Sequence, residues 1–512
     1  MQHILGISRH QLRISSLEDT ISPDNQVRFI DVFVSFVDLS KLGFSVQTLK
    51  KEGRPSYRSQ VFLKIYLYGY LNGIRSSRKL EKECLRNIEL QWLLEAIGPN
   101  YHSISDFRKN NPTALKNLFK LFVVFLKDAD LIGCETIAID GTKSRAHNSK
   151  KANFNQKKID KHLEYIETKT QEYLDALEEN DAKDNPEKIK NIQQKMERLK
   201  QNKIRYELLE EGLKTSGEPQ ISTTDSDARA LLVQGQVVEI SFNIQAAVDA
   251  KHNLVVATHT INKNDRSALS AIAIEAKENL GIETYTALVD KGYYNGKQIE
   301  ICKQANITTI VAQPEQGKSN KNGTTKDYLV AQFRYDKTSD TYTCPQGEIL
   351  KTTGSWHKKT TDKDSYNFKK YRTPKCKECP VKHLCTSRAA GREIDRSQYA
   401  DAVEENNIRY AENPQLYRKR QEINEHIFGT IKRQWGYNHT NLTGLEKVNA
   451  EHSLIMLVYN IKRSINILGV PDLIAKLQKW NSPYKAKVLF LLKTSYLKLN
   501  TTADFYPEKY AA

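Results

Sequence analysis

Apolar residues recur at helical spacing along the first 130 positions of the chain. The runs Val61–Leu71, Leu80–Ile97 and Ala114–Leu126 place them three or four positions apart, which predicts amphipathic helices. Polar turns separate these runs, and Ser103–Arg108 offers capping serines before another helix. Short basic helices joined by turns favour a helix-turn-helix that reads DNA, and a bundle for packing or dimerisation explains the same pattern equally well.

The period changes after residue 134. The β-type runs are Glu135–Asp140, Val237–Asp249, Leu254–Ile261, Thr286–Asp290 and Thr308–Ala312, with helical stretches at Ser267–Leu280 and Gly296–Ala305. Three strands that can pair as a meander, followed by strands joined through helices, predict a mixed α/β sheet compatible with a ribonuclease-H-like core. A long charged pattern over 157–215, broken near Asp181–Pro186, predicts an inserted pair of antiparallel helices.

These patterns divide the chain into five segments. The predicted order is a helical N-terminal DNA-binding domain (1–130), the first part of the core (131–312, containing the hairpin 157–215), a polar insertion with four Cys (313–405), the C-terminal part of the core (406–470) and a basic tail (471–512). The hairpin is interpreted as a solvated appendage or a self-association arm.

Composition adds a charge argument. The chain has 512 residues, with 78 Lys and Arg against 61 Asp and Glu, a formal net charge of +17. Such an excess indicates a polyanionic partner, most often nucleic acid, although a generally basic soluble protein has the same balance. Seven Cys form no disulfide framework. With neither a membrane-spanning run nor an apolar leader, the sequence predicts a cytoplasmic, nucleoid-associated protein without a membrane partner.

Three carboxylates lie where metal ligands would lie. Asp140 and Asp290 each end an apolar run, which places them at a sheet edge, and Glu425 lies on a predicted helix. Phosphodiester cleavage by two divalent ions needs such carboxylates, and oxygen ligands select Mg²⁺ or Mn²⁺. An Asp after a strand is also common turn chemistry. Further acids near the predicted sheet are Asp225, Asp227, Asp249 and Asp265. Asp249 is interpreted as a residue of a hairpin turn. Asp225 and Asp227 precede the second strand, and a polar loop is favoured over the alternative that they approach the metal ions.

Glu425 has charged neighbours on its helix. Lys432 follows it by seven residues and therefore shares its face, where it can contact a phosphate. Arg420 and Tyr417 can grip another phosphate. A solvated helix with ion pairs explains these residues equally well.

Several motifs together resemble the DDE transposases of bacterial insertion sequences, in the branch with a Tyr–Arg–Glu–Lys signature. The matching pieces, in the family's order, are Ile139-Asp140-Gly141-Thr142, Thr224–Arg229, Gln245–Asp249, Val289–Tyr294 and Glu425–Arg433, and Arg54–Arg108 resembles the family's N-terminal helical region. The resemblance implies a ribonuclease-H-like core with Asp140, Asp290 and Glu425 as ligands of two Mg²⁺ or Mn²⁺ ions.

The signature departs from the family pattern at one position. The family places Arg four residues before Glu, but Gln421 stands there and Arg420 is one step further away. Tyr417 and Arg420 keep their own spacing, as do Glu425 and Lys432. Glu422 is a nearby alternative, but Gly429 rather than Lys follows it by seven residues.

The resemblance implies an enzyme that binds the terminal inverted repeats of its element as double-stranded DNA, cuts them and joins them to target DNA. It also implies a homodimer in the synaptic complex. Two alternatives stay open: a metal-dependent nuclease or resolvase without strand transfer, and a silent DNA-binding descendant of a transposase. Residues expected to contact DNA beside the signature are Lys143, Arg145, Arg433 and Trp435, and Tyr437 is expected either to stack on a base or to seal the core.

The Cys set is a separate hypothesis. Cys376 and Cys379 have CxxC spacing, Cys385 follows, and Cys344 precedes them in a Cys-Pro-Gln-Gly turn. Four thiolates can close a structural Zn²⁺ site in an insertion with little apolar core, with His383 as a spare ligand. Four reduced, partly buried thiols are the alternative. Three further Cys in apolar contexts are predicted to be core residues: Cys84, Cys134 and Cys302.

Overall fold

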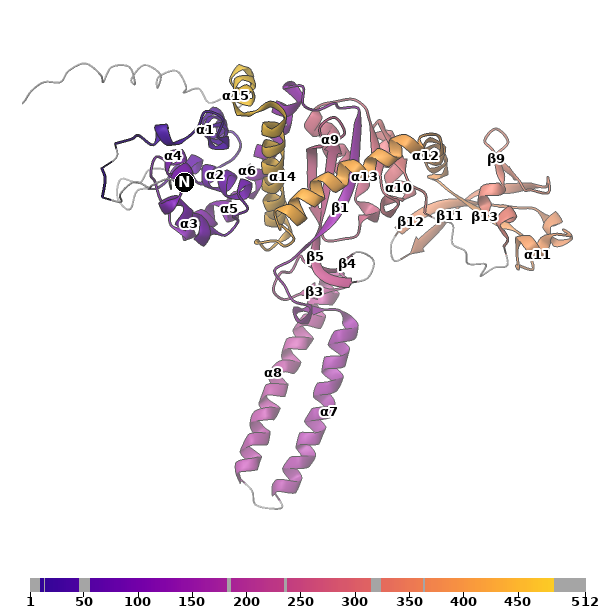
Figure 1. Ribbon diagram of the computed structural model, residues 1–512. Helices are drawn as coiled ribbons and strands as arrows, with labels where there is room; N and C mark the ends of the chain where they lie inside the picture. Colours follow the sequence, from indigo (N-terminus) through magenta and orange to yellow (C-terminus); the bar gives the residue numbers. More distant parts are fainter. Residues whose placement is uncertain are drawn as a thin grey trace, which may run out of the picture.

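A mixed β-sheet lies at the centre of the molecule, between the N-terminal helices on one side and a second sheet on the other (Figure 1). The computed structural model describes residues 10–12, 14–45, 56–181, 186–233, 237–314, 324–361 and 364–482. The predicted basic tail therefore lies outside the described residues from position 483 onward. No helix in these ranges is long and apolar enough to cross a bilayer.

Six α-helices form the described N-terminal region. They are α1 Gln26–Phe36, α2 Ser59–Leu71, α3 Ser77–Arg86, α4 Ile88–Leu93, α5 Tyr101–Asn110 and α6 Pro112–Asp128. The run expected to be one helix over Leu80–Ile97 is two, because the Asn87 side chain accepts the backbone N–H groups of Glu89 and Leu90 and starts α4. Likewise Asn100, not a serine, caps α5, and Ser103 lies inside it.

The described strands of the central sheet lie in the order β4-β5-β1-β7-β8, with β6 also on β5. Their bounds are β1 Thr136–Arg145, β4 Arg229–Val233, β5 Val237–Asp249, β6 Leu254–Ile261, β7 Tyr285–Val289 and β8 Ile307–Val311. β1 is antiparallel to β5 and parallel to β7, and β7 is parallel to β8. This mixed sheet is consistent with a ribonuclease-H-like fold.

Helices cover this sheet and join it to the N-terminal region. They are α9 Leu269–Leu280, α10 Gly296–Gln304, α12 Ala400–Glu412, α13 Pro414–Phe428, α14 Leu445–Leu468 and α15 Val470–Lys479, with the π-helical segment η8 Gly429–Gln434 after α13. α14 is buried along most of its length and packs on both α6 and β6. Apolar residues of the N-terminal helices and of the sheet therefore belong to one continuous core.

The charged segment is a helical hairpin, as its pattern indicated. α7 (Gln156–Asp181) and α8 (Pro186–Ser216) pack against each other and project away from the sheet (Figure 1). A two-stranded ribbon, β2 Asn153–Phe154 with β3 Ile221–Ser222, closes the base. Phe154, Ile159 and Leu213 form a small core there.

Residues 313–400 contain more regular structure than their polar, turn-rich sequence indicated. A second sheet has the order β13-β12-β11-β10-β9. Its strands are β9 Arg334–Asp336, β10 Thr341–Thr343, β11 Ile349–Thr361, β12 Asp364–Arg372 and β13 Glu393–Ser397, with the short helix α11 Lys382–Cys385 before β13. Its own core is small: Phe333, Tyr342, Leu350, Tyr371 and Ile394.

Candidate active site

Asp140 lies in the middle of β1, not at its end as the sequence predicted. The strand continues to Arg145 because β5 pairs with it along its whole second half. The three residues before Asp140 are fully buried. The Asp140 side chain itself keeps 29% of its surface exposed, so it is partly buried at the edge of the core and still accessible to solvent.

Asp290 directly follows β7 and begins the short 3₁₀ helix η4, Lys291–Tyr293. β1 and β7 are parallel neighbours, with Ile139 opposite Val289. The next residue on each strand is the aspartate, so the parallel register places Asp140 and Asp290 side by side. Two residues 150 positions apart in the chain are thus brought together by strand pairing.

Arg420 joins the two carboxylates. Its guanidinium lies 3.5 Å from Oδ2 of Asp140 and 3.5 Å from Oδ1 of Asp290. It comes from α13, which packs across β1 and β7 (Figure 1). The ring of Tyr417, one turn earlier, lies 5.5 Å from the guanidinium carbon. One positive charge therefore faces both aspartates.

Burial raises the pKa of Asp140 to about 6. The N–H of Gly141, which donates to Oδ1 at 2.8 Å, and the Arg420 charge oppose this rise, while the neighbouring Asp290 and Asp265 charges add to it. A carboxylate that is both desolvated and close to other acids needs positive charge nearby. The site is thus electrostatically suited to a cation.

Lys432 lies against the other half of β1. Its Nζ donates to Oγ1 of Thr142 at 3.0 Å and to the carbonyl oxygen of Lys143 at 2.9 Å. Burial lowers the pKa of this amine. Thr142 follows Asp140 by two residues and therefore faces the same side of the sheet. α13 and η8 together lay Arg420 and Lys432 along one strand.

The structure does not bring Glu425 to the two aspartates. Glu425 is exposed and accepts a hydrogen bond from Nε2 of Gln421 at 2.8 Å. The residue one turn after Arg420 on the same helix face is Asn424, which is buried. Its side-chain N and O have no hydrogen-bond partner among the residues that the structure describes. The shift of one position in the sequence signature is thus visible as a rotation around α13.

The donor set tests the fit of a divalent cation. Asp140 and Asp290 offer hard oxygen ligands of the kind that Mg²⁺ and Mn²⁺ prefer, already arranged around one positive group. Within the described ranges, no three His, Cys, Asp or Glu side chains form a group able to hold a metal ion. The pair fits a cation, and a third protein ligand is not in place.

Comparison with known families adds independent information. Residues 15–110 match a family described as Transposase domain (DUF772), and residues 343–465 match one described as Transposase DDE domain. Both matches are to transposase domains, and together they support an insertion-sequence transposase of the DDE class. No curated protein and no solved structure matches it.

The two matched segments cover different parts of this transposase. The first spans α1 to α5 and the second includes Arg420, Glu425 and Lys432. Asp140 and Asp290 lie between the matched segments. Their assignment therefore depends on the sequence motifs and on the geometry described above.

The other residues expected to contact DNA differ in their surroundings. Arg145 and Arg433 are exposed. Lys143 instead pairs with Asp265 at 3.0 Å. Trp435 is partly buried, with Nζ of Lys462 5.5 Å from its ring. Tyr437 is buried and donates to the carbonyl of Tyr70, so it seals the core and is not available to stack on a base.

The four further acids serve different parts of the transposase. Asp225 and Asp227 accept backbone N–H groups at the start of α14. Asp249 accepts the backbone N–H of Lys251 in the turn after β5, in agreement with its interpretation as a turn residue. It also accepts those of Gly133 and Cys134, just before β1. Asp265 lies beside the catalytic candidates, and no motif singled it out. Its partners come from two distant strands, so no local pattern could reveal them.

The four Cys of the insertion are free thiols and partly exposed. Sγ of Cys344 accepts the N–H of Glu348 at 3.3 Å, and burial raises the pKa of the Cys385 thiol, with the other three Cys contributing to the rise. They lie in one neighbourhood, but they are not among any metal-binding group in the described chain. Cys84 and Cys302 are buried in the core as predicted, and Cys134 is partly buried.

Proposed function

We propose that this transposase cuts DNA at the terminal inverted repeats of its element and transfers the freed strand to target DNA, with Asp140 and Asp290 as ligands of two Mg²⁺ or Mn²⁺ ions. The observation that supports this proposal is the pair of neighbouring aspartates around one cationic group. Such ions, when bound, would make the attacking oxygen a better nucleophile and would neutralise the negative charge that develops on the leaving oxygen. The parallel pairing of β1 with β7, with Asp140 on the first and Asp290 directly after the second, also supports the proposal.

The chain's own side chains supply the rest of the site. Arg420 is free to neutralise a phosphate once a metal ion takes over its present role between the carboxylates. Lys432 bonds to β1 beside Asp140 and presents a second positive charge to the DNA strand whose phosphate Arg420 would neutralise. Tyr417 packs against Arg420 and orients it.

Glu425 is proposed to complete one coordination shell. Its support is its place on α13, the helix that already carries Arg420 onto the aspartates. Two neighbours make a matched comparison: Asn424 on the buried face and Glu422 on the exposed one. Glu425→Ala should abolish cleavage while Glu422→Ala should not. If Asn424→Ala abolishes it and Glu425→Ala does not, the third position belongs to the Arg420 face.

The decisive experiment uses labelled DNA that carries the repeats flanking the gene. Asp140→Asn and Asp290→Asn should lose cleavage at least a thousandfold and keep end binding, whereas Asp472→Asn, at the start of α15, should behave as wild type. Retained cleavage in either aspartate variant would remove that residue from the site. Cleavage without joining to a target duplex would favour a nuclease, and binding without cleavage a silent descendant.

Helix α3 is proposed to read the inverted repeats. It follows α2 through a short turn in which Gly73 has φ +74°, the arrangement of a helix-turn-helix. Its buried side carries Leu80 and Cys84. Its exposed side carries four basic residues: Arg78, Lys79, Lys82 and Arg86. A positive, exposed second helix is the usual partner of the major groove.

Binding to end DNA at several salt concentrations tests the role of α3. Arg78→Ala and Lys82→Ala should each weaken binding and reduce the slope of log affinity against log salt by about one. Lys479→Ala, an exposed lysine at the end of α15, is the matched control and should change neither. Equal effects of all three variants would assign the affinity to overall charge and not to α3.

The hairpin is proposed to pair with the hairpin of a second copy in the synaptic complex. Residues 171–180 of α7 contain four acids and no Lys or Arg, whereas residues 186–205 of α8 contain seven Lys or Arg and two acids. A two-fold axis that sets α7 against α8 of the partner therefore matches opposite charges. DNA would repel the acidic helix.

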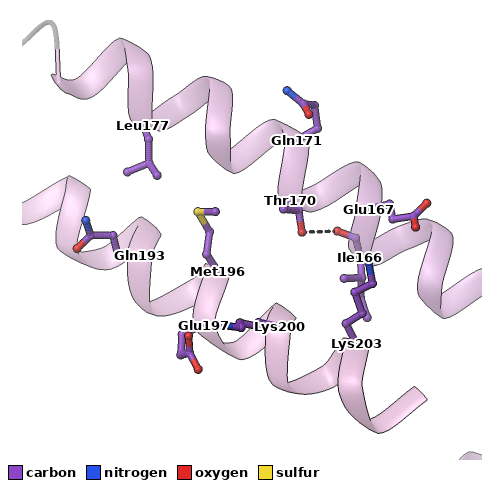
Figure 2. Close-up of a pocket in the computed structure, with 10 residues that line it drawn as sticks. All are labelled: Ile166, Glu167, Thr170, Gln171, Leu177, Gln193, Met196, Glu197, Lys200 and Lys203. Atoms are coloured by element: carbon purple, nitrogen blue, oxygen red, sulfur yellow. Dashed lines mark hydrogen bonds between the residues drawn. The ribbon is translucent and has the colours of Figure 1, made fainter. Parts of the chain in front are cut away.

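Apolar surface on the hairpin supports the same pairing. Its exposed apolar residues are Tyr165, Leu174, Ile204 and Leu208. A hollow of about 670 Å³ lies between the helices, and Leu177 and Met196 point toward each other across it (Figure 2). In light-scattering measurements Leu208→Glu should be a monomer, while the exposed control Gln194→Glu should dimerise as wild type does. A monomeric wild-type complex with DNA ends would exclude this interface.

A further inference from the structure

The residue Asp265 lies between the two backbone segments that carry the aspartates. It begins the 3₁₀ helix η3, Asp265–Ser267, just after β6. A Cβ added at Gly141, the residue after Asp140, would lie 2.5 Å from Oδ1 of Asp265. A Cβ added at Gly292, two residues after Asp290, would lie 3.9 Å from Cβ of Asp265. Glycine at position 141 therefore makes room for this carboxylate.

The Asp265 carboxylate is held by three side chains from two strands. Oδ1 accepts from Nδ2 of Asn243 at 2.7 Å and from Nε2 of Gln245 at 2.9 Å, both on β5. Oδ2 accepts from Nζ of Lys143 on β1 at 3.0 Å. The side chain of Asp265 is about three-quarters buried, with 26% of its surface exposed. A buried acid with three donors has a fixed position.

The same network continues to the Asp290 segment. Gln245 donates to Asp265 through its nitrogen and accepts, through Oε1, from the hydroxyl of Tyr293. Tyr293 is fully buried, and its backbone N–H donates to the carbonyl of Asp290 at 3.1 Å. A chain of hydrogen bonds thus links the turn after β7 to the strand that carries Asp140.

Asp265 acts from the opposite face of the sheet. Neighbouring residues of a strand point to opposite sides, so Gly141 and Lys143 face Asp265 while Asp140 and Thr142 face α13. The contacts agree: Arg420 of α13 meets Asp140 and Lys432 of η8 meets Thr142, whereas the β1 side chain that bonds Asp265 is Lys143. Asp265 therefore cannot share a ligand position with Asp140 without a rearrangement of β1.

We propose that Asp265 is a positioning residue that fixes the distance between Asp140 and Asp290 through the Gln245–Tyr293 link and the Lys143 ion pair. This inference rests on the proposed function, because the distance matters only if the two aspartates bind metal together. Residues that do not bind the metal but fix the positions of its ligands tune metal affinity in protein sites. Loss of the Asp265 charge lets both segments relax and weakens the metal site without removing a ligand.

Titration of the full chain with Mn²⁺, followed by the electron paramagnetic resonance of the free ion, tests the proposal without turnover. Asp265→Asn should weaken Mn²⁺ binding about ten- to hundredfold and raise the Mg²⁺ concentration for half-maximal cleavage similarly. Gly141→Ala, which pushes the network away without changing its charge, should do the same. Asp227→Asn, an equal charge change at the start of α14, should leave Mn²⁺ binding unchanged.

The outcomes separate the two proposals. If the wild type binds no Mn²⁺, or if Asp140→Asn binds Mn²⁺ as tightly as the wild type does, the metal-dependent function itself fails. If wild type binds Mn²⁺ and both Asp265→Asn and Gly141→Ala, folded by circular dichroism, bind it equally well, the positioning role alone is overturned. A thermal midpoint lowered equally in Asp265→Asn and Asp227→Asn, with weaker Mn²⁺ binding only in the first, supports it.

Discussion

At the scale of single residues, Asp140 carries an energetic cost in the metal-free protein. It follows three fully buried residues and is itself desolvated. Arg420 offsets this only in part, because its two contacts are long, at 3.5 Å, and shared with Asp290. A residue whose ionised form is disfavoured by the fold is typical of a functional site and not of a stabilising one.

The first prediction concerns Asp140→Asn in the presence of EDTA. Because the folded pKa of about 6 exceeds the ordinary value of 3.8, ionisation destabilises the wild type as pH rises through that window. The variant should be more stable than wild type by up to about 3 kcal/mol above pH 6, with the gap closing toward pH 4. Urea unfolding at pH 4 to 8 measures it. A wild type more stable than the variant at pH 7 would contradict the prediction.

The sequence predicted both aspartates but not the course of the strand through them. The Asp-Gly-Thr run after Ile139 is typical of a turn, yet β1 continues to Arg145 because β5 pairs with it. Lys432 and Asp265, from distant segments, also bond Thr142 and Lys143. Such partners cannot be read from local pattern. The same reason explains why Asp265 was noted only as an acid near the sheet and was given no role. The orientation of Glu425 relative to Arg420 depends on one residue of spacing along α13.

At the scale of elements, the insertion shows how a sheet forms with little core. β11 and β12 pair along most of their length, but among the described residues the core cluster of this sheet contains five large apolar side chains. Apolar residues are few in the two strands and do not alternate regularly with polar ones along β11, which is why the sequence pattern did not reveal these strands. A sheet with so small a core needs another source of stability.

The zinc hypothesis supplies such a source and remains a prediction. Purified chain should contain about one equivalent of zinc, and Cys376→Ser should lose it together with the β9–β13 sheet, because metal-binding free energy is folding free energy in small sites. Metal analysis and far-ultraviolet circular dichroism measure both. Cys302→Ser, in the main core, should keep the metal. Zinc-free wild type with an intact sheet would leave the four residues as reduced thiols.

Helix α14 gives a third prediction. The N–H groups of Gly444 and Leu445 at its start donate to Asp225 and Asp227, which lie more than 200 positions earlier in the chain, and not to a neighbouring side chain. Asp227→Ala should lower the free energy of unfolding by about 1 kcal/mol, the usual value of a helix N-terminal acceptor. Urea unfolding measures the loss. Glu446→Ala, exposed in the first turn of the same helix, should cost only a few tenths of a kcal/mol.

At the scale of the whole molecule, the N-terminal region is part of the main core and not a detachable reader. Glu451 on α14 is fully buried between Arg75 and Arg108, at 3.5 and 3.8 Å. Tyr70 receives a hydrogen bond from Arg108 at 2.7 Å, and its carbonyl accepts from Tyr437. Binding at α3 is therefore rigidly connected to the helix that packs on the catalytic sheet.

The last prediction tests this connection with Glu451→Gln. The substitution keeps the shape but leaves two buried guanidinium groups without a counter-charge, and breaking such a group costs about 3–5 kcal/mol. Glu446→Gln, an exposed acid on the same helix, should cost well under 1 kcal/mol. In wild type, circular dichroism and tryptophan fluorescence should report one coincident urea transition, since one core unites both regions. Separate urea transitions in the wild type would show that the N-terminal helices fold independently of the sheet. Equal losses of unfolding free energy in Glu451→Gln and Glu446→Gln would show that Glu451 does not unite the two regions.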